Sequence, residues 1–174
     1  SPSERLQLIQ ALLDAGVPAI EVGALVSAKA VPAMAGTDEL IRQLPAADCL
    51  FSALIPNRRG YDTGQQLGIK LMSLVLAATD TMNLKNIKMN TAEILQVSRE
   101  VLHQAKRDNQ AVQAYVATAW ACPFEGQVAA NQVADLCGAL LEAGASQCVI
   151  ADTIGAADPE AVHRLMSQLV AEFG

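Results

Sequence analysis

The chain has 174 residues, of which 52% are hydrophobic and 17% charged, so it can bury a core and is not a disordered sequence. Its net charge is −6 and its pI about 4.8. The longest run of basic residues is two, as in Arg58–Arg59, which is too short for a duplex-binding surface, so we expect no nucleic-acid partner. No apolar run reaches the roughly 20 residues that a membrane span requires, so we expect no membrane partner either.

The cysteines and histidines form no recognisable metal site. Cys49, Cys122, Cys137 and Cys148 are widely spaced and make no Cys-x-x-Cys pair. We interpret them as small, mostly buried residues in a reducing compartment, and expect a cytoplasmic protein. The sequence has no His-x-His and no His-Glu-x-x-His, so we expect no metal ligands among these 174 residues.

The first segment in chain order predicts a helix. Ser1 can cap it, Pro2 suits the first helical position, Glu4 completes a capping box and Gly16 ends the helix. Apolar, partly β-branched runs then alternate with segments of helical spacing, one of which opens with the capping box Asn90–Glu93. We expect strands at 17–26, 49–55, 70–78, 111–119 and 147–151, and further helices at 37–44, 59–67, 90–107, 128–143 and from 159 onward.

This alternation predicts an α/β fold in which helices cover a parallel sheet. Two architectures fit it: a doubly wound open sheet, or part of a (β/α)₈ barrel. No glycine-rich phosphate loop is present, which weakens the first as a dinucleotide-binding fold. A complete barrel needs about 250 residues. Five strands could therefore form only part of a barrel, and both architectures remain open on these patterns alone. We expect residues 1–174 to form a single domain, incomplete if it is a barrel, with a further strand before the opening helix.

Acidic residues stand out within one predicted strand and just after another. Glu21 lies inside an apolar strand, where a carboxylate costs free energy unless it is paired or binds something. Asp152 and Thr153 follow the strand at 147–151, where parallel α/β folds place their ligands. A structural ion pair for Glu21 and a turn role for Asp152 remain alternatives. Cys122 has no histidine near it in sequence, so we interpret it as a packing residue rather than a nucleophile.

Five segments resemble the hydroxymethylglutaryl-CoA lyase family, in the family's order and across nearly the whole chain. The segments are Ile20–Glu21 with VSAKAVPAM at 26–34, PNRRGY at 56–61, AATD at 77–80 with NIK at 86–88, YV at 115–116 with ACPFEG at 121–126, and DTIG at 152–155. The resemblance implies a partial (β/α)₈ TIM barrel, comprising about strands two to six of eight with their helices.

The resemblance also implies an activity. The family cleaves 3-hydroxy-3-methylglutaryl-CoA to acetyl-CoA and acetoacetate with Mg²⁺ or Mn²⁺, by retro-Claisen chemistry. By resemblance, Asp152 would handle the proton of the substrate hydroxyl and Glu21 would position an arginine, while Ser27, Asn86 and Thr153 would contact an acyl-CoA substrate. The family's Arg-Asp pair, His-x-His and catalytic cysteine have no match within residues 1–174, so we expect the metal ligands to lie outside this chain.

Two other readings remain open. The same barrel could carry a Claisen-type acyltransferase or an aldolase, and departures such as Ala28 and Ala30 indicate a divergent member whose acyl-CoA could differ. Alternatively, the chain could be a non-catalytic truncated barrel that serves as a binding or assembly module. In either form an open barrel exposes unpaired strand edges, so we expect a homo-oligomer.

Overall fold

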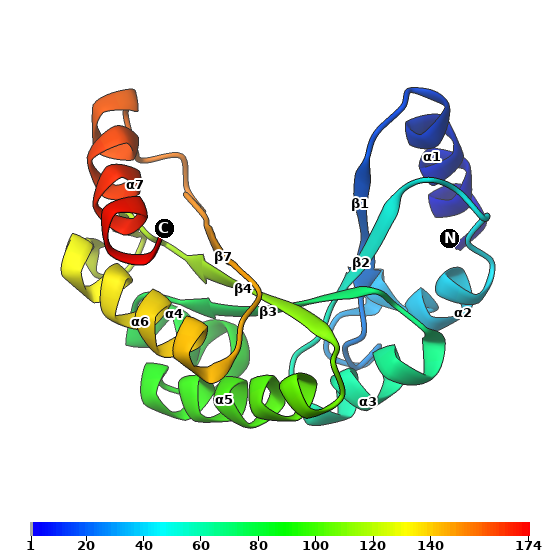
Figure 1. The fold of residues 1–174 in the computed structure, drawn as a ribbon, viewed down its shortest axis with the longest axis horizontal. Coiled ribbons are helices and arrows are strands. Elements are labelled where there is room, and N and C mark those ends of the chain that lie inside the picture. Colours follow the sequence, from blue (N-terminus) through cyan, green and yellow to red (C-terminus); the bar gives the residue numbers. More distant parts are fainter. Residues whose placement is uncertain (1) are drawn as a thin grey trace.

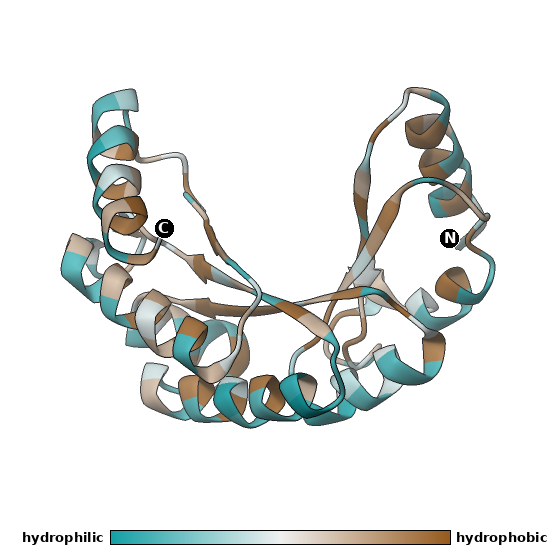
Figure 2. Cartoon of the chain, in the orientation of Figure 1, coloured by the Kyte–Doolittle hydropathy of each residue, from teal (hydrophilic) through white to brown (hydrophobic). Residues whose placement is uncertain are grey.

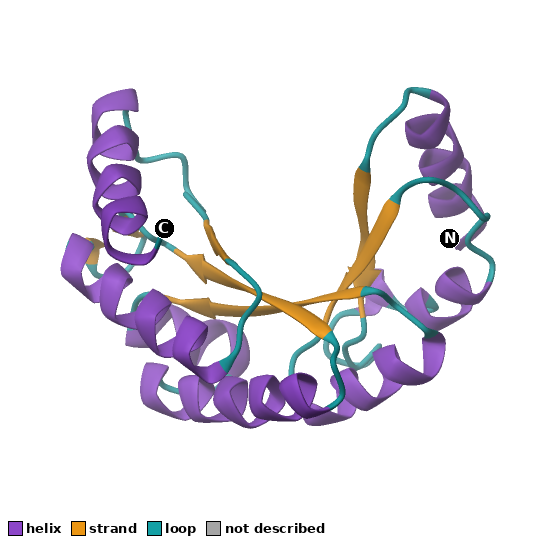
Figure 3. Cartoon of the chain, viewed as in Figure 1, coloured by secondary structure: helices purple, strands orange, loops and turns teal. Residues whose placement is uncertain are grey.

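The computed structural model describes residues 2–174 and contains an arc of five parallel strands with helices along its outer side (Figures 1 and 3). The cap predicted at Ser1 lies outside the described residues. The strands lie in the order β1 (Ala19–Ala24), β2 (Leu50–Leu54), β3 (Leu71–Ala77), β4 (Ala111–Ala117) and β7 (Cys148–Ile150). Because this order never reverses, the sheet lacks the switch point of a doubly wound fold and has the topology of a barrel arc.

The helices alternate with the strands, as the apolar pattern predicts. They are α1 (Pro2–Asp14), α2 (Thr37–Arg42), α3 (Arg58–Leu67), α4 (Asp80–Ile87), α5 (Thr91–Arg107), α6 (Ala130–Ala143) and α7 (Pro159–Phe173), with a 3₁₀ turn η1 (Pro32–Met34). The strands are shorter than predicted because pairing, rather than hydrophobicity, sets their ends. β1, for example, is interrupted by a register shift between Glu21 and Ala24.

Besides the 3₁₀ turn η1, two features were not predicted. Helix α4 has a weak apolar pattern, and Asn83 is its only buried residue. The side chain of Asn83 pairs with the end of β3, accepting from the Ala77 N–H and donating to the Ala77 carbonyl, both at 2.8 Å. The other element is a small antiparallel hairpin, β5 (Ala121–Cys122) with β6 (Gly126–Gln127).

Local signals fix several helix ends. At α5 the predicted capping box is present: the Glu93 N–H donates to Asn90 Oδ1 at 2.9 Å and the Asn90 N–H donates to Glu93 Oε2 at 2.7 Å. At α7, Asp158 accepts from the Ala161 N–H at 2.7 Å. Such caps stabilise a helix by about 1 kcal/mol each.

The core lies between the outer face of the sheet and the helices. Met72, Leu74 and Leu76 alternate along β3, are almost fully buried and belong to the same cluster as Leu102 of α5 and Leu140 of α6. Burying one such side chain contributes roughly 1.5–3 kcal/mol. The hydropathy colouring shows hydrophobic residues along the strands and mixed helices, as expected for amphipathic helices that face a sheet (Figure 2).

Successive side chains of a strand point to opposite faces, so the residues between these core positions point into the arc. The inward residues of β2 and β3 include Leu50, Ser52, Ser73 and Val75. Leu50 is 43% exposed, because no further strand covers this side within the described chain. Strands β1 and β7 form the two edges of the arc (Figure 1). None of the helices at residues 2–174 is long and apolar enough to cross a membrane.

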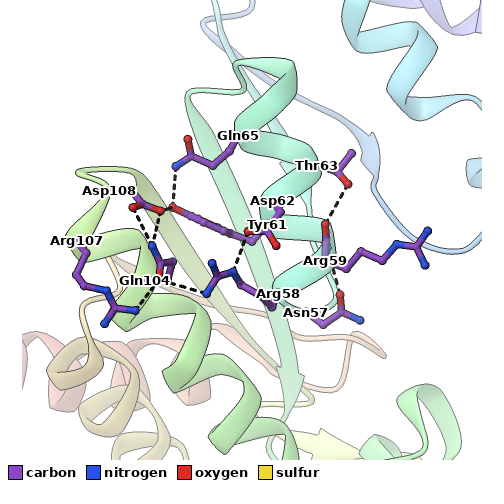
Figure 4. A network of polar contacts seen from close by, with 11 residues as sticks. Asn57, Arg58, Arg59, Tyr61, Asp62, Thr63, Gln65, Gln104, Arg107 and Asp108 are labelled. Carbon is purple, nitrogen blue, oxygen red and sulfur yellow. Dashed lines mark hydrogen bonds and ion pairs between the residues drawn. The ribbon is translucent and has the colours of Figure 1, made fainter.

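A polar network ties α3 to the end of α5 (Figure 4). The hydroxyl of Tyr61 donates to Asp108 at 2.7 Å, and Gln104 donates to the same carboxylate at 2.9 Å. Arg58 donates to Asp62 on its own helix and to Gln104 across the interface. The network holds together two helices that cover neighbouring strands.

Candidate active site

Glu21 begins a chain of hydrogen bonds across the inner face of the sheet. The Ser73 hydroxyl of β3 donates to Glu21 Oε2 of β1 at 2.7 Å, and Gln113 Nε2 of β4 donates to Ser73 Oγ at 2.9 Å. Gln147, just before β7, donates to Gln113 Oε1 at 2.6 Å. Glu21 is exposed to the interior of the arc, whereas Ser73 and Gln113 are buried. A carboxylate within an apolar strand is thus satisfied by a hydroxyl, and not by an ion pair.

The charge of Glu21 reaches a second inward residue, Tyr115. Tyr115 lies two residues after Gln113 and therefore on the same face of β4. Burial raises the pKa of Tyr115, and the negative charge of Glu21 raises this pKa further. Glu21 is the only charged residue in the five strands of the arc. Within the five strands, the inner face of the sheet therefore carries one negative charge, that of Glu21.

Asp152 lies in the turn after β7, where its carboxylate accepts from the Ala156 and Ala157 N–H groups at 3.0 and 2.9 Å. These backbone donors, Ala157 first, hold the pKa of Asp152 below its ordinary value. A carboxylate has about four acceptor positions, so others remain for a ligand. The structure therefore gives Asp152 the turn role that sequence reasoning left as an alternative, and leaves it ionised.

Thr153 links the ends of two neighbouring strands. Its Oγ1 accepts a hydrogen bond of 2.8 Å from the backbone N–H of Thr118, just after β4. Thr118 has a φ of 54°, which is uncommon for a β-branched residue, and it is fully buried. The Thr153 side chain is exposed and its hydroxyl hydrogen is available, so it can donate to a ligand at this edge of the sheet.

Ser27 lines an open cavity of about 500 Å³ at the carboxyl ends of β1 and β2. The loop after β1 forms one side, and Asn57, Arg59 and Gly60 at the start of α3 form the other. Gly60 is required here, because a Cβ would lie 2.6 Å from Pro56. Neither Glu21 nor Asp152 lines this cavity, so the structure does not bring Ser27 together with them in one pocket.

Asn86 lies on the exposed side of α4, away from the cavity beside Ser27. The start of α4 contacts the hairpin, where Glu125 accepts from the Thr81 N–H at 2.7 Å and Lys85 lies 4.8 Å from the ring of Phe124. The structure therefore places Asn86 on the exposed side of α4 and does not bring it together with Glu21, Ser27 or Asp152 in one pocket.

Cys122 is buried at the base of this hairpin and accepts from the Thr79 hydroxyl at 3.1 Å. Burial raises the pKa of the thiol, but donation from Thr79 and from the N–H groups of Phe124 and Glu125 outweighs it and leaves the pKa below its ordinary value. No histidine contacts Cys122 in the described chain, which agrees with its interpretation as a packing residue.

Sequence reasoning missed the polar residues that support these positions. Ser73, Gln113 and Asn83 are all buried, and each interrupts or flanks an apolar run. A buried polar residue in an apolar strand is a usable signal, because it must find a hydrogen-bond partner. The partners themselves depend on strand register, which the sequence does not give.

Mg²⁺ or Mn²⁺ would need several carboxylate or imidazole ligands in one place. Among residues 2–174 no group of three or more His, Cys, Asp or Glu side chains is arranged to hold a metal ion. The described residues therefore do not by themselves fit the cation, and we derive no step through it.

An arc of parallel strands in sequential order, with a helix after each, is the architecture of part of a (β/α)₈ barrel. The family model described as HMGL-like matches residues 1–174, and the chain belongs to this family. A hydroxymethylglutaryl-CoA lyase of Pseudomonas mevalonii is 37% identical over 95% of this chain, and a (R)-citramalyl-CoA lyase of Chloroflexus aurantiacus is 38% identical over 94% of it.

Solved structures confirm the predicted fold class. The HMG-CoA lyase of Bacillus subtilis superposes with a TM-score of 0.94 at 32% identity, covering 99% of this chain and 58% of that one. An HMG-CoA lyase of Acinetobacter baumannii, in complex with coenzyme A and 3-methylmalate, superposes with a TM-score of 0.91 at 30% identity. The chain spans 55% of the length of each of the two lyases compared by sequence, so it corresponds to part of a barrel of this kind.

Proposed function

We propose that this chain forms the central part of an acyl-CoA lyase that cleaves 3-hydroxy-3-methylglutaryl-CoA, or a related 3-hydroxyacyl-CoA, to acetyl-CoA and a keto product. The observation that carries the proposal is Glu21, the single charge on the inner face of an arc whose relatives are acyl-CoA lyases. A carboxylate held by a hydrogen bond on the inner face of a barrel arc can bind or orient reacting groups.

In this reaction a base removes the proton of the substrate hydroxyl, and the bond between that carbon and the thioester α-carbon breaks. The bonding electrons pass to the thioester enolate, which an acid then protonates. We assign the contact with the hydroxyl to Asp152, which is ionised and keeps acceptor positions free. We assign Glu21 to orienting a cationic partner from outside this chain.

Three further residues are assigned to substrate binding. The Thr153 hydroxyl can donate to a substrate oxygen while it accepts from Thr118. Ser27 lines the cavity of about 500 Å³, which has room for part of an acyl-CoA. Asn86 would contact the substrate from α4.

Members of this family use a divalent cation that holds and polarises substrate oxygens. We propose that Mg²⁺ or Mn²⁺ is required, with its ligands supplied by residues outside this chain. We also propose a homo-oligomeric, cytoplasmic protein. A relative from Danio rerio is described as cytoplasmic, whereas one from Bos taurus is described as mitochondrial.

Two related acyl-CoA compounds are candidate substrates. The relatives include both a hydroxymethylglutaryl-CoA lyase and a citramalyl-CoA lyase at nearly the same identity to this chain. A Claisen-type acyltransferase or aldolase on the same barrel, and a non-catalytic module, remain the alternatives. The unpaired edges of β1 and β7 support the non-catalytic alternative for this chain taken alone.

The test is an assay of acetyl-CoA release from 3-hydroxy-3-methylglutaryl-CoA and from citramalyl-CoA, with Mg²⁺ or Mn²⁺, using the protein in its natural full length. Glu21→Gln should reduce kcat by a factor of about 100 or more, as expected for loss of an orienting charge. Glu142→Gln, an exposed carboxylate on α6, is the matched control and should leave the rate unchanged. Condensation without cleavage would favour the acyltransferase, and neither reaction would favour the non-catalytic module.

A further inference from the structure

The hydrogen bonds that reach Glu21 all run in one direction across the sheet. Gln147 donates to Gln113, Gln113 donates to Ser73, and Ser73 donates to Glu21, at 2.6, 2.9 and 2.7 Å. The four residues come from β1, β3, β4 and the segment that leads into β7. This series of hydrogen bonds therefore spans the sheet from one edge to the other. No two of the four residues are closer than 34 positions in sequence.

The direction is fixed by what each group can donate. A serine hydroxyl has one hydrogen and two acceptor positions. Because Gln113 Nε2 occupies an acceptor position of Ser73 Oγ, the hydrogen of Ser73 is left for Glu21. Hydrogen bonds to a charged acceptor are the stronger kind, so the Ser73–Glu21 bond can hold a carboxylate that is otherwise exposed.

We propose that Ser73 is a positioning residue that holds the Glu21 carboxylate at one place on the inner face, and that Gln113 and Gln147 keep the Ser73 hydrogen directed at Glu21. Only the expected effect of Ser73 on catalysis rests on the proposed function. The placement itself is a property of the described chain and can be measured without any activity.

Both Glu21 and Ser73 have a physical reason to depend on this hydrogen bond. Glu21 has three rotatable bonds, and no second donor to its carboxylate is present among residues 2–174, so without Ser73 it would sample many positions. Ser73 itself is fully buried, and a buried hydroxyl must be satisfied. Ser52 supplies a matched control, because it is a buried serine on the same face, pairs directly with Glu21 in the β1–β2 register and takes no part in the hydrogen-bond chain.

Tyr115 provides the measurement. In the full-length protein, Tyr115→Phe assigns the signal of Tyr115, which is then titrated by NMR of tyrosine labelled at the ring carbon that bears the hydroxyl. The charge of Glu21 is one of the two causes that raise the pKa of Tyr115, so the pKa of Tyr115 reports whether that charge stays in place.

Glu21→Gln sets the scale and should lower the pKa of Tyr115, because one of the two causes that raise this pKa is removed. Ser73→Ala should lower it most of the way to the same value, while Ser73→Thr and Ser52→Ala should leave it at the wild-type value. The proposal is overturned if Ser73→Ala behaves as wild type, or if Glu21→Gln has no effect. Circular dichroism of each variant checks that it is folded.

The catalytic consequence is tested separately in the lyase assay with the full-length protein. Ser73→Ala should lower kcat by about tenfold with little change in KM, and Ser73→Thr should restore it, because positioning affects the reacting geometry more than substrate binding. If the titration behaves as expected but no lyase activity exists, Ser73 still positions Glu21 and only the proposed function fails. If the enzyme is active and Ser73→Ala matches wild type in both measurements, the positioning role is wrong.

Discussion

The hydroxyl of Tyr61 on α3 donates to the carboxylate of Asp108 at the end of α5, over 2.7 Å and 47 positions of sequence. Tyr61 is 1% exposed and also accepts a hydrogen bond from Gln65 at 2.7 Å. The phenol thereby links α3 to the end of α5, beside the hydrogen bond from Arg58 to Gln104. Because the two residues are far apart in sequence, their hydrogen bond forms only when α3 and α5 are packed together on the outer side of the sheet.

Removing this hydroxyl should destabilise the fold measurably. We expect Tyr61→Phe to lower the free energy of unfolding by about 1–2 kcal/mol, because the hydrogen bond to a charged acceptor is lost and Gln65 loses its acceptor. Urea unfolding followed by circular dichroism measures this change. Tyr115→Phe, at the other tyrosine, is the control and should change the stability by less than about 0.5 kcal/mol. Equal losses in the two variants would contradict the role given to Tyr61.

The same tyrosine predicts an alkaline transition. Burial and the hydrogen bond to Asp108 raise the pKa of Tyr61 to about 12, from about 10 in the unfolded chain. The folded state therefore holds this proton while the unfolded state releases it, so the stability that Tyr61 contributes is complete below about pH 10 and is lost as the pH rises towards 12. Unfolding curves recorded between these values should show the loss in wild type and a smaller loss in Tyr61→Phe.

Asp152 allows its turn role and its proposed catalytic role to be separated. Asp152→Asn keeps an oxygen that accepts from one backbone N–H, whereas Asp152→Ala keeps none. We expect Asp152→Asn to remain close to wild type in thermal stability and to lose most of its lyase activity, while Asp152→Ala loses both. Retention of full activity by Asp152→Asn would remove Asp152 from the chemistry.

The lowered pKa of Asp152 also has a consequence at acid pH. Its folded-state pKa lies below the ordinary value of about 3.8, so its contribution to stability is present above that value and is lost as the pH falls through the folded-state pKa. Acid unfolding of wild type should therefore be steeper in this range than that of Asp152→Asn. Identical acid profiles would show that the turn contributes nothing to the difference.

Asn83 gives the largest stability effect we expect from a polar side chain. Asn83→Ala leaves the N–H and carbonyl of Ala77 without partners at a buried strand end, which should cost roughly 2–4 kcal/mol. Asn86→Ala, on the exposed side of the same helix, should cost less than about 0.5 kcal/mol. Chemical denaturation of the two variants in parallel distinguishes a specific hydrogen-bond pair from a general effect on α4.

The chain without further strands should associate with itself. Strands β1 and β7 leave one edge each unpaired, and inward residues such as Leu50 are exposed. We expect sedimentation velocity to show concentration-dependent oligomers of the 174-residue chain, and calorimetry to show no tight Mg²⁺ or Mn²⁺ binding. A monomer with cooperative unfolding, or stoichiometric binding at micromolar concentration, would contradict these expectations.

The sequence predicts the order of helices and strands well because the runs that form them are continuous and apolar, as in β3, where nearly every residue is hydrophobic. It predicts helix starts such as that at Asn90, because capping depends on residues three positions apart. It does not predict α4, whose stability depends on Asn83 and the end of β3 rather than on an amphipathic pattern.

The candidate site is only partly predictable for the same reason. Glu21 and Asp152 are visible as carboxylates in or after apolar strands. The dependence of Glu21 on Ser73 is not visible, because the two residues are separated by 52 positions and meet only through the register of three strands. Likewise, Ser27 and Asp152 both follow strands, yet Asp152 does not line the cavity beside Ser27. The sequence does not show this, because only the folded sheet fixes which loops are neighbours.

The strand order of the arc has a consequence for how the chain folds. Since each strand lies beside the one that follows it in the main sheet, every new pairing closes only the connection between consecutive strands of that sheet, the longest of which contains α4 and α5. Folding can therefore begin with any neighbouring pair and extend in either direction, without a late step that joins distant parts of the chain. A nick in an exposed connection, such as the hairpin around Phe124, would leave complete strand–helix units on both sides, and the two pieces should reassociate when mixed.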